Sequence, residues 1–327
     1  FGMLTAKKQI VQFEDTAIQK SVDVQATQTR YAFTCGPVDL NITFTAPLLM
    51  DDLELLSRPV NYLSYETKSN DGKKHNVEIY FEASANWALN TPYQKSESEV
   101  IERDNLVYLK TGSVEQKVLA RKGDDVRIDW GYFYMVAENE NVKYAVEDKK
   151  LSLTKSLGNA SNASGKIMLG YDDLYSIQYF GENLRPYWNR TNNKTIFDVF
   201  AAANAQYKSL LKKCDDFDMQ LMKDAREAGG EKYAELCALA YRQAIAAHKL
   251  VEAPNGDLLF LSKENFSNGS IGTVDITYPS APLFLLYNPE LVKGLMNHIF
   301  YYSESGRWTK PFAAHDVGTY PIANGQT

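Results

Sequence analysis

The chain has 327 residues, of which 44% are hydrophobic and 23% are charged, so it is long enough for two domains and apolar enough for a sizeable core. The net charge of −6 and the isoelectric point near 5.4 argue against nucleic-acid binding, which needs a basic face or arm. No run of about 18 or more apolar residues predicts a membrane-spanning helix.

The first half of the sequence predicts β-strands. Apolar and polar residues alternate over residues 38–45 and 77–82, which is the period of a half-buried strand, and residues 126–130 continue the pattern. Turn sequences separate these runs at Asn70-Asp71-Gly72, Gly123-Asp124-Asp125 and Gly158-Asn159. Short strands at such spacing favour a β-sandwich.

The second half predicts helices. Apolar residues recur at helical spacing over residues 196–228, and Gly229-Gly230 then provides a stop signal. A second helix is expected over residues 233–247. Asn288-Pro289 offers an N-cap and a first-turn proline for a third helix, which is expected to end near Tyr302.

The change from strands to helices predicts a domain boundary between Leu184 and Thr195. We expect a β-sandwich domain at residues 1–188 and a helical domain at residues 189–327.

Candidate site residues gather in the loops between Phe260 and Thr327, where polar groups between rigid elements are typical of catalysis. Glu264 could belong to a site, or it could cap a helix or form a surface ion pair. Asp275 lies between Val274 and Ile276. If this segment is a strand, its side chain points away from theirs, toward solvent or, as we favour, into a cleft.

His315-Asp316 is the best local pair of reactive groups. Histidine titrates near neutral pH, and a nearby carboxylate can orient it or stabilise its charge. Neighbours in sequence need not face each other, so a purely structural pairing is an equal alternative.

Several catalytic patterns are absent from the sequence, including the GxSxG nucleophile elbow, the phosphate-binding P-loop and the HExxH zinc pattern. The remaining candidates are carboxylates and a histidine, which suit hydrolysis by general acid and base. Metal is not required for such chemistry, although calcium held by Asp and Asn oxygens is compatible with it.

Long segments of the chain resemble the glutaminase A family. KENFSNGSIGTVDITYPSAPLFLLYNPEL and PFAAHDVGTYPIANGQ closely resemble its central domain. SRPVNYLSYETKSNDGKKHNVEIYFEASANW and RIDWGYFYMVA are similar to its N-terminal domain, and ALAYRQAIAAHKL fits the start of its helical part. The resemblance covers essentially the whole chain, in the order of the family.

This resemblance implies a β-sandwich followed by a six-hairpin α/α toroid like those of many glycoside hydrolases. It also implies hydrolysis of glutamine to glutamate and ammonia by an enzyme outside the cytoplasm. The family continues beyond the last motif, whereas this chain ends at Thr327 and starts at Phe1 without an initiator methionine. We therefore expect only the opening hairpins of the toroid, one side of the site, and a leader removed by processing.

The family motifs place nine residues in the expected pocket. The expected catalytic residues are Glu264, Asp275, His315 and Asp316, and the expected substrate-binding residues are Arg242, Gln243, Lys263, Asn265 and Tyr320. Asp316 or Glu264 would activate water and His315 would orient or donate a hydrogen bond. Arg242 would suit the substrate's α-carboxylate, since its planar fork binds carboxylates in a bidentate manner.

Two other functions stay open on the sequence alone. A glycoside hydrolase would use the same paired carboxylates, because fold does not fix function. A non-catalytic module that binds glutamine or a sugar is the other.

Overall fold

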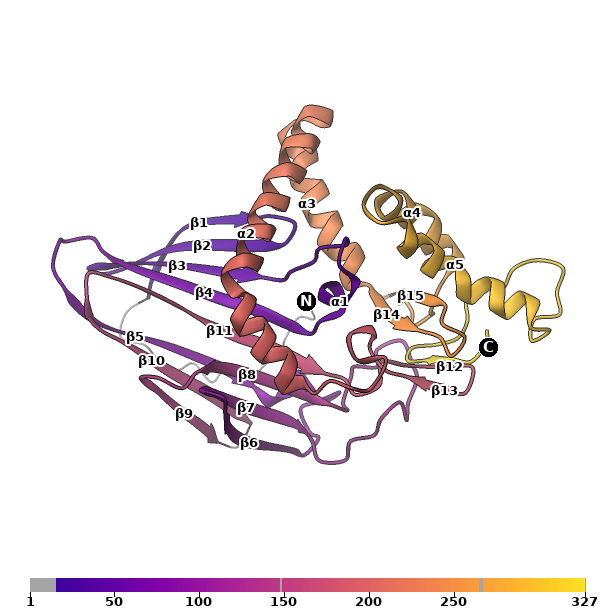
Figure 1. Cartoon of the computed structure of the whole chain (residues 1–327), viewed down its shortest axis with the longest axis horizontal. Coiled ribbons are helices and arrows are strands. Elements are labelled where there is room, and N and C mark those ends of the chain that lie inside the picture. Colours follow the sequence, from indigo (N-terminus) through magenta and orange to yellow (C-terminus); the bar gives the residue numbers. More distant parts are fainter. Residues whose placement is uncertain (1–15, 148, 265–266, 327) are drawn as a thin grey trace.

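A computed structural model describes residues 16–147, 149–264 and 267–326 of the chain (Figure 1). Its first half is built of strands and its second half mainly of helices, as the sequence predicts. No helix in these ranges is long and apolar enough to cross a membrane.

Two antiparallel sheets form the first half. The large sheet has eight strands in the order β1 (Ile18–Val24), β2 (Gln28–Cys35), β3 (Val38–Thr45), β4 (Val60–Ser69), β11 (Asn162–Asp172), β8 (Tyr132–Glu138), β7 (Leu106–Ser113) and β6 (Ser96–Arg103). The small sheet has three strands in the order β5 (His75–Ser84), β10 (Lys150–Ala160) and β9 (Val142–Glu147). A short helix, α1 (Leu53–Ser57), and a 3-10 turn, η1 (Ala85–Ala88), lie in the connections.

The central strands of the large sheet bury both faces. On β7, Leu106 and Tyr108 belong to one buried cluster, whereas Val107 and Leu109 belong to another. Strand β8 alternates in the same way between the two clusters. Because side chains alternate across a strand, a strand covered on both sides reads as a continuous apolar run. One cluster joins the large sheet to the small one and forms the sandwich.

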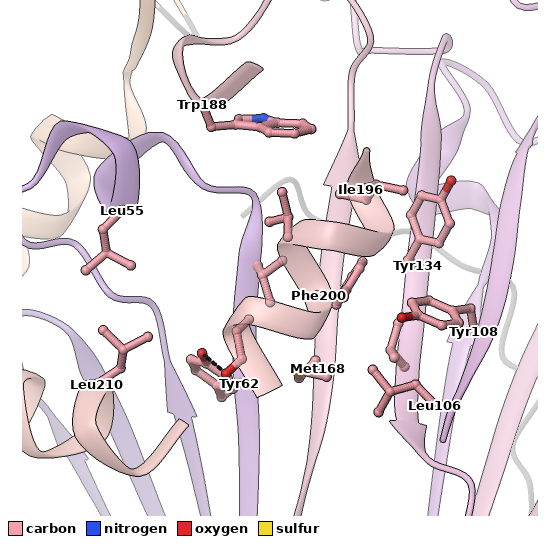
Figure 2. Packing of buried hydrophobic residues seen from close by; sticks show 14 of the residues in the cluster. Leu55, Tyr62, Leu106, Tyr108, Tyr134, Met168, Trp188, Ile196, Phe200 and Leu210 are labelled. Carbon is pink, nitrogen blue, oxygen red and sulfur yellow. Dashed lines mark hydrogen bonds between the residues drawn. The ribbon is translucent and has the colours of Figure 1, made fainter. Parts of the chain in front are cut away.

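The long helix α2 (Ile196–Gly229) covers the other face of the large sheet. Phe200 is fully buried against Tyr108 and Tyr134, with ring centroids 5.7 and 5.9 Å away (Figure 2). The Tyr62 hydroxyl donates to the Ala203 carbonyl at 2.8 Å. The helix begins with a capping box between Thr195 and Asp198, which satisfies its first free N–H groups.

The rest of the chain forms a helical region beside the sandwich. It contains the turn η2 (Tyr187–Asn189), α3 (Glu231–Ala246), the hairpin of β14 (His248–Glu252) and β15 (Leu258–Ser262), α4 (Val274–Tyr287) and α5 (Pro289–Glu304). The strands β12 (Ile177–Tyr179), β13 (Glu182–Leu184) and β16 (Ile322–Ala323) form a small sheet in which β12 and β16 run parallel. The division at residue 188 stays a prediction.

Several local predictions are confirmed. The strand at residues 38–45 is β3, the first predicted helix is α2, and the second is α3. The third is α5, which Asn288 caps by accepting a hydrogen bond from the Glu290 N–H at 3.1 Å.

Two local predictions are wrong, and the strand considered for Asp275 is not present. Residues 126–130 are irregular and form no strand, and Asp129 among them is only 2% exposed and accepts from Gln94 and Arg121. Gly158-Asn159 lies within β10, where the register shifts as in a β-bulge. Asp275 stands in the first turn of α4, not in a strand; Pro279 and Pro282 inside that helix hid it from a reading of helical periodicity.

Candidate active site

Two loops that are distant in sequence run side by side at the candidate site. Ile271 donates its N–H to the Gly318 carbonyl at 2.9 Å, and Val317 donates back to Ile271 at 3.0 Å. Val274 donates to the His315 carbonyl at 2.9 Å. This backbone pairing brings the start of α4 next to the segment that carries His315 and Asp316.

The pairing gathers Glu264, Asp275, His315 and Asp316, which we call the His315 cluster. His315 Nδ1 lies 2.9 Å from Asp316 Oδ2, and its Nε2 lies 3.4 Å from Asp275 Oδ1. The Asp316 side chain is 11% exposed and that of Asp275 is 67% exposed. The imidazole therefore stands between a carboxylate behind it and one that faces solvent.

Hydrogen bonds fix the two inner carboxylates of the His315 cluster. The second oxygen of Asp316, Oδ1, accepts the Gly318 N–H at 2.9 Å. Glu264 accepts from the Ser267 hydroxyl at 3.1 Å and from the Thr273 hydroxyl at 3.3 Å. Each carboxylate therefore accepts one hydrogen bond at each of its two oxygens, and the two bonds to Glu264 are longer than the two to Asp316.

The surroundings favour the charged form of His315. Its hydrogen bond to Asp316 raises the pKa of the imidazole, and the charges of Asp275, Asp316 and Glu264 add to this against a smaller effect of burial. A histidine in this state can donate a proton near neutral pH and take it back.

Two family models account for most of the chain. The "Glutaminase A six helical-hairpin domain" matches residues 230–327, and a domain of unknown function, DUF5127, matches residues 27–155 and 146–224. The chain belongs to the glutaminase A family. The resemblance found in the sequence is thereby confirmed, as is the fold of a β-sheet domain followed by a helical-hairpin domain.

Curated relatives carry the same family name. The chain is 27% identical over 348 residues to Glutaminase A of Aspergillus oryzae, covering 95% of this chain and 50% of the relative. It is 24% identical over 333 residues to a probable glutaminase of Arthroderma benhamiae, covering 86% of this chain and 38% of the relative. The chain therefore spans half or less of the length of these two glutaminase A relatives.

Solved structures resemble the chain only weakly. One described as a candidate kojibiose phosphorylase from the human microbiome is 10% identical, with a TM-score of 0.40 over 68% of this chain and 27% of that one. A likeness at this level supports no conclusion about function.

The structure places the expected substrate-binding residues in different surroundings. Lys263 lies beside Tyr320, with its Nζ 4.9 Å from the ring centroid, and Tyr320 itself is buried. Arg242 donates to the Thr29 hydroxyl on β2 at 2.7 Å, so it faces the large sheet and not the His315 cluster. Gln243 is exposed near the end of α3, and Asn265 lies outside the described residues.

A loop of the sandwich also reaches the site, which the sequence did not predict for this glutaminase A chain. Asp124 Oδ1 accepts the Gly269 N–H at 2.9 Å, and Gly123 donates to the Tyr320 carbonyl at 3.2 Å. A Cβ on Gly269 would lie 2.7 Å from the Gly123 carbonyl oxygen, so only glycine fits there. The long irregular stretch between β7 and β8 was the available signal, because such loops are often functional.

The other histidines have different roles. His298 is fully buried and His248 stacks on Phe260, and burial lowers the pKa of each to about 4. His75 pairs with Asp71 at the end of β5, far along the sandwich. His315 is the histidine that combines exposure with a raised pKa.

A metal site is not apparent at the His315 cluster. Within residues 16–147, 149–264 and 267–326, no group of three or more His, Cys, Asp or Glu could hold a metal ion. Calcium binding through other oxygens stays a prediction.

Proposed function

We propose that the chain supplies the acid and base groups of a hydrolase that releases ammonia from glutamine. The observation that carries the proposal is the His315 cluster: one exposed imidazole with three carboxylates around it, within the segment that matches the six helical-hairpin domain of the glutaminase A family. Action outside the cytoplasm, as the resemblance implies, is part of the proposal.

The geometry suggests a role for each group. Amide hydrolysis needs a base to activate water and an acid to protonate the departing amine. His315 suits the acid, because its Nε2 faces the open side and its charged form is favoured. Asp316 suits orientation of the imidazole, since its Oδ2 lies 2.9 Å from His315 Nδ1 and its side chain is only 11% exposed.

Glu264 suits the base in this scheme. Its two hydrogen bonds come from hydroxyl groups, at 3.1 and 3.3 Å, and leave lone pairs for a water molecule. This assignment differs from the equal choice between Asp316 and Glu264 that the sequence alone allowed.

Ammonia release from glutamine by the 327-residue chain tests the proposal. We expect Glu264→Gln to lower turnover by about 10²–10⁴-fold, the usual contribution of a positioned base. Asp316→Asn should also lower turnover well beyond about threefold, because the imidazole of His315 loses the carboxylate that orients it. Asp71→Asn, beside His75 at the far end of the sandwich, is the matched control and should leave turnover unchanged. If both site variants stay within about threefold of the unmodified chain, the assignment is wrong.

A glycoside hydrolase is the second candidate. Tyr278 is 85% exposed and follows Asp275 by three residues on α4, so an aromatic ring and a carboxylate share one helix face. Release of reducing sugar from oligosaccharides without ammonia from glutamine would favour it. Saturable binding of glutamine or a sugar without turnover would instead support a binding module.

A further inference from the structure

A cavity lies between α1, η2 and α2, away from the side of α2 that packs on Tyr108 and Tyr134. Its volume is about 410 Å³, within the range of small-molecule sites. Leu55, Trp188 and Leu210 supply apolar walls, and Figure 2 shows Leu55 and Leu210 facing each other from α1 and α2. None of its lining residues belongs to the His315 cluster.

The sequence of α2 explains the open side of this cavity. Ala202, Gln206, Ser209 and Lys213 recur at three- and four-residue spacing, so they lie along one face of the helix. All four are exposed. The cavity therefore has apolar inner walls and a polar rim that a ligand can reach from solvent.

The acidic groups of the cavity are already engaged. Glu54 accepts from Arg190 and from Lys194, each at 2.6 Å. Asp198 accepts from Thr195 in the capping box of α2, and Asp52 accepts the Leu55 N–H at the start of α1. All three carboxylates already accept hydrogen bonds from the protein, two of them as caps at the starts of α1 and α2. Few acceptors are therefore left for a ligand.

The basic groups of the cavity have unused donors. Arg58 donates through Nη1 to Gln206 at 2.8 Å, but its Nε and Nη2 are buried without a hydrogen-bond partner. Burial lowers the pKa of Arg58, and Tyr62 and Asp52 offset this only in part. A buried cationic donor without a partner is costly, and a ligand that accepts hydrogen bonds would remove that cost.

The two free nitrogens of Arg58 define the chemistry of that ligand. Nε and Nη2 form one edge of the guanidinium, and such an edge binds a carboxylate through two parallel hydrogen bonds. Since the cavity offers free donors and occupied acceptors, its ligand should present acceptors. We propose that this cavity binds a small organic carboxylate with an apolar body, held by Arg58 at the charged end and by Leu55, Trp188 and Leu210 along its body.

Binding requires a small movement of Arg58. Its Nε and Nη2 expose almost no surface, so the guanidinium turns toward the cavity when the carboxylate enters. This turn gives up one hydrogen bond, to Gln206, and gains two to a charged acceptor. Lys213, exposed on the rim without an ion pair among the described residues, adds positive charge at the entrance.

Calorimetric titration of the 327-residue chain with phenylacetate tests the proposal, with neutral phenylacetamide and inorganic sulfate as matched probes. We expect one phenylacetate per chain, with phenylacetamide bound at least about tenfold more weakly because it cannot form the charge-assisted pair. Sulfate should also bind at least about tenfold more weakly, because it lacks a body to fill the apolar walls.

Variants on either side of the cavity locate the binding. Arg58→Gln should weaken phenylacetate binding at least about tenfold, since it removes the charged fork. Ala202→Trp should fill the cavity from its exposed side without changing the core, and it should therefore abolish phenylacetate binding. This variant tests the proposal if Arg58→Gln does not fold. Lys208→Gln, an exposed change on α2 away from the cavity, should leave binding unchanged.

The proposal is overturned if phenylacetate does not bind, if all three probes bind alike, or if folded Arg58→Gln and Ala202→Trp retain full affinity. None of these outcomes depends on hydrolase activity at the His315 cluster.

Discussion

The sandwich and the helical region solve the burial of apolar side chains differently. In the large sheet, strands β7 and β8 bury both faces, one against the small sheet and one against α2. In α4, whose sequence is largely apolar, only Phe284 is buried, and Tyr278 and Leu286 are 85% and 75% exposed. Stability in the sandwich therefore rests on packing across both faces of a sheet, whereas around the site backbone pairing between loops acts together with a buried cluster that includes Ile271, Val317 and Tyr320.

The largest expected effect lies at the junction of α2 and the large sheet. Phe200→Ala should lower the free energy of unfolding by about 3–5 kcal/mol, because it leaves a cavity where the ring packs against Tyr108 and Tyr134. Leu286→Ala on the exposed face of α4 is the control and should change it by less than about 0.5 kcal/mol. Urea unfolding measures both, and equal effects would remove the contrast between the two regions.

The next effect tests the loop that supports Glu264. Gly272 has a φ of +64°, and a Cβ there would lie 2.1 Å from Nε2 of the fully buried His298. Gly272→Ala should cost about 2–4 kcal/mol from overpacking and left-handed strain together. Gly306 has a φ of +73°, and a Cβ added there would meet open space, so Gly306→Ala measures the backbone strain without a clash. We expect it to cost about 1 kcal/mol. If both glycine variants lose the same stability in urea, the clash with His298 is not real.

A smaller effect should appear where the sandwich meets the site. Asp124→Ala removes the acceptor of the Gly269 N–H and should cost about 1 kcal/mol, the usual net value of one hydrogen bond. Asp125→Ala removes a neighbouring charge without a hydrogen bond to the backbone of Gly269, so its cost should be smaller. Thermal unfolding compares the two, and the order would be reversed if the loop were held by charge alone.

The smallest effect concerns the titration of His315. Its raised pKa favours the folded state at low pH, so this contribution is complete below the ordinary value of 6.5 and is lost as the pH rises through the folded value. NMR titration of the imidazole signals should place His315 above 6.5 and His248 and His298 near 4. The buried pair has the opposite sign: its contribution is present above 6.5 and is lost as the pH falls toward 4.

Asp316→Asn tests whether Asp316 is the cause of the raised pKa of His315. It should lower the pKa of His315, because it removes the largest favourable partner, and leave the two buried histidines in place. An unchanged His315 would mean that Asp316 does not set its charge.

Much of the fold could be predicted from the sequence where a single element shows its own periodicity. The alternation at residues 38–45 and the helical repeat from Ile196 each report burial on one or two faces of one element. The helix α4 could not be predicted in this way, because a largely apolar helix with two prolines has no clear amphipathic period. The strand predicted at residues 126–130 is wrong, because apolar side chains such as Trp130 are buried there although the backbone pairs with no strand.

The candidate site was predicted in part. Sequence reasoning selected all four members of the His315 cluster, and the structure brings them together, although their catalytic roles stay a proposal. Arg242 was chosen for its chemistry, but α3 turns it toward β2.

The sequence by itself determined the order of strands and then helices along the chain, and the family, because these depend on local periodicity and on long motifs. The burial of both faces of β7 and β8 came from the tertiary structure. Only the tertiary structure decided which loops meet. Asp124 and Gly269 are 145 residues apart, and His315 reaches Asp275 because the backbones of residues 271–274 and 315–318 pair. Such pairings are made by backbone N–H and C=O groups, which nearly all residues have in common, so no pattern of side chains in the sequence predicts them.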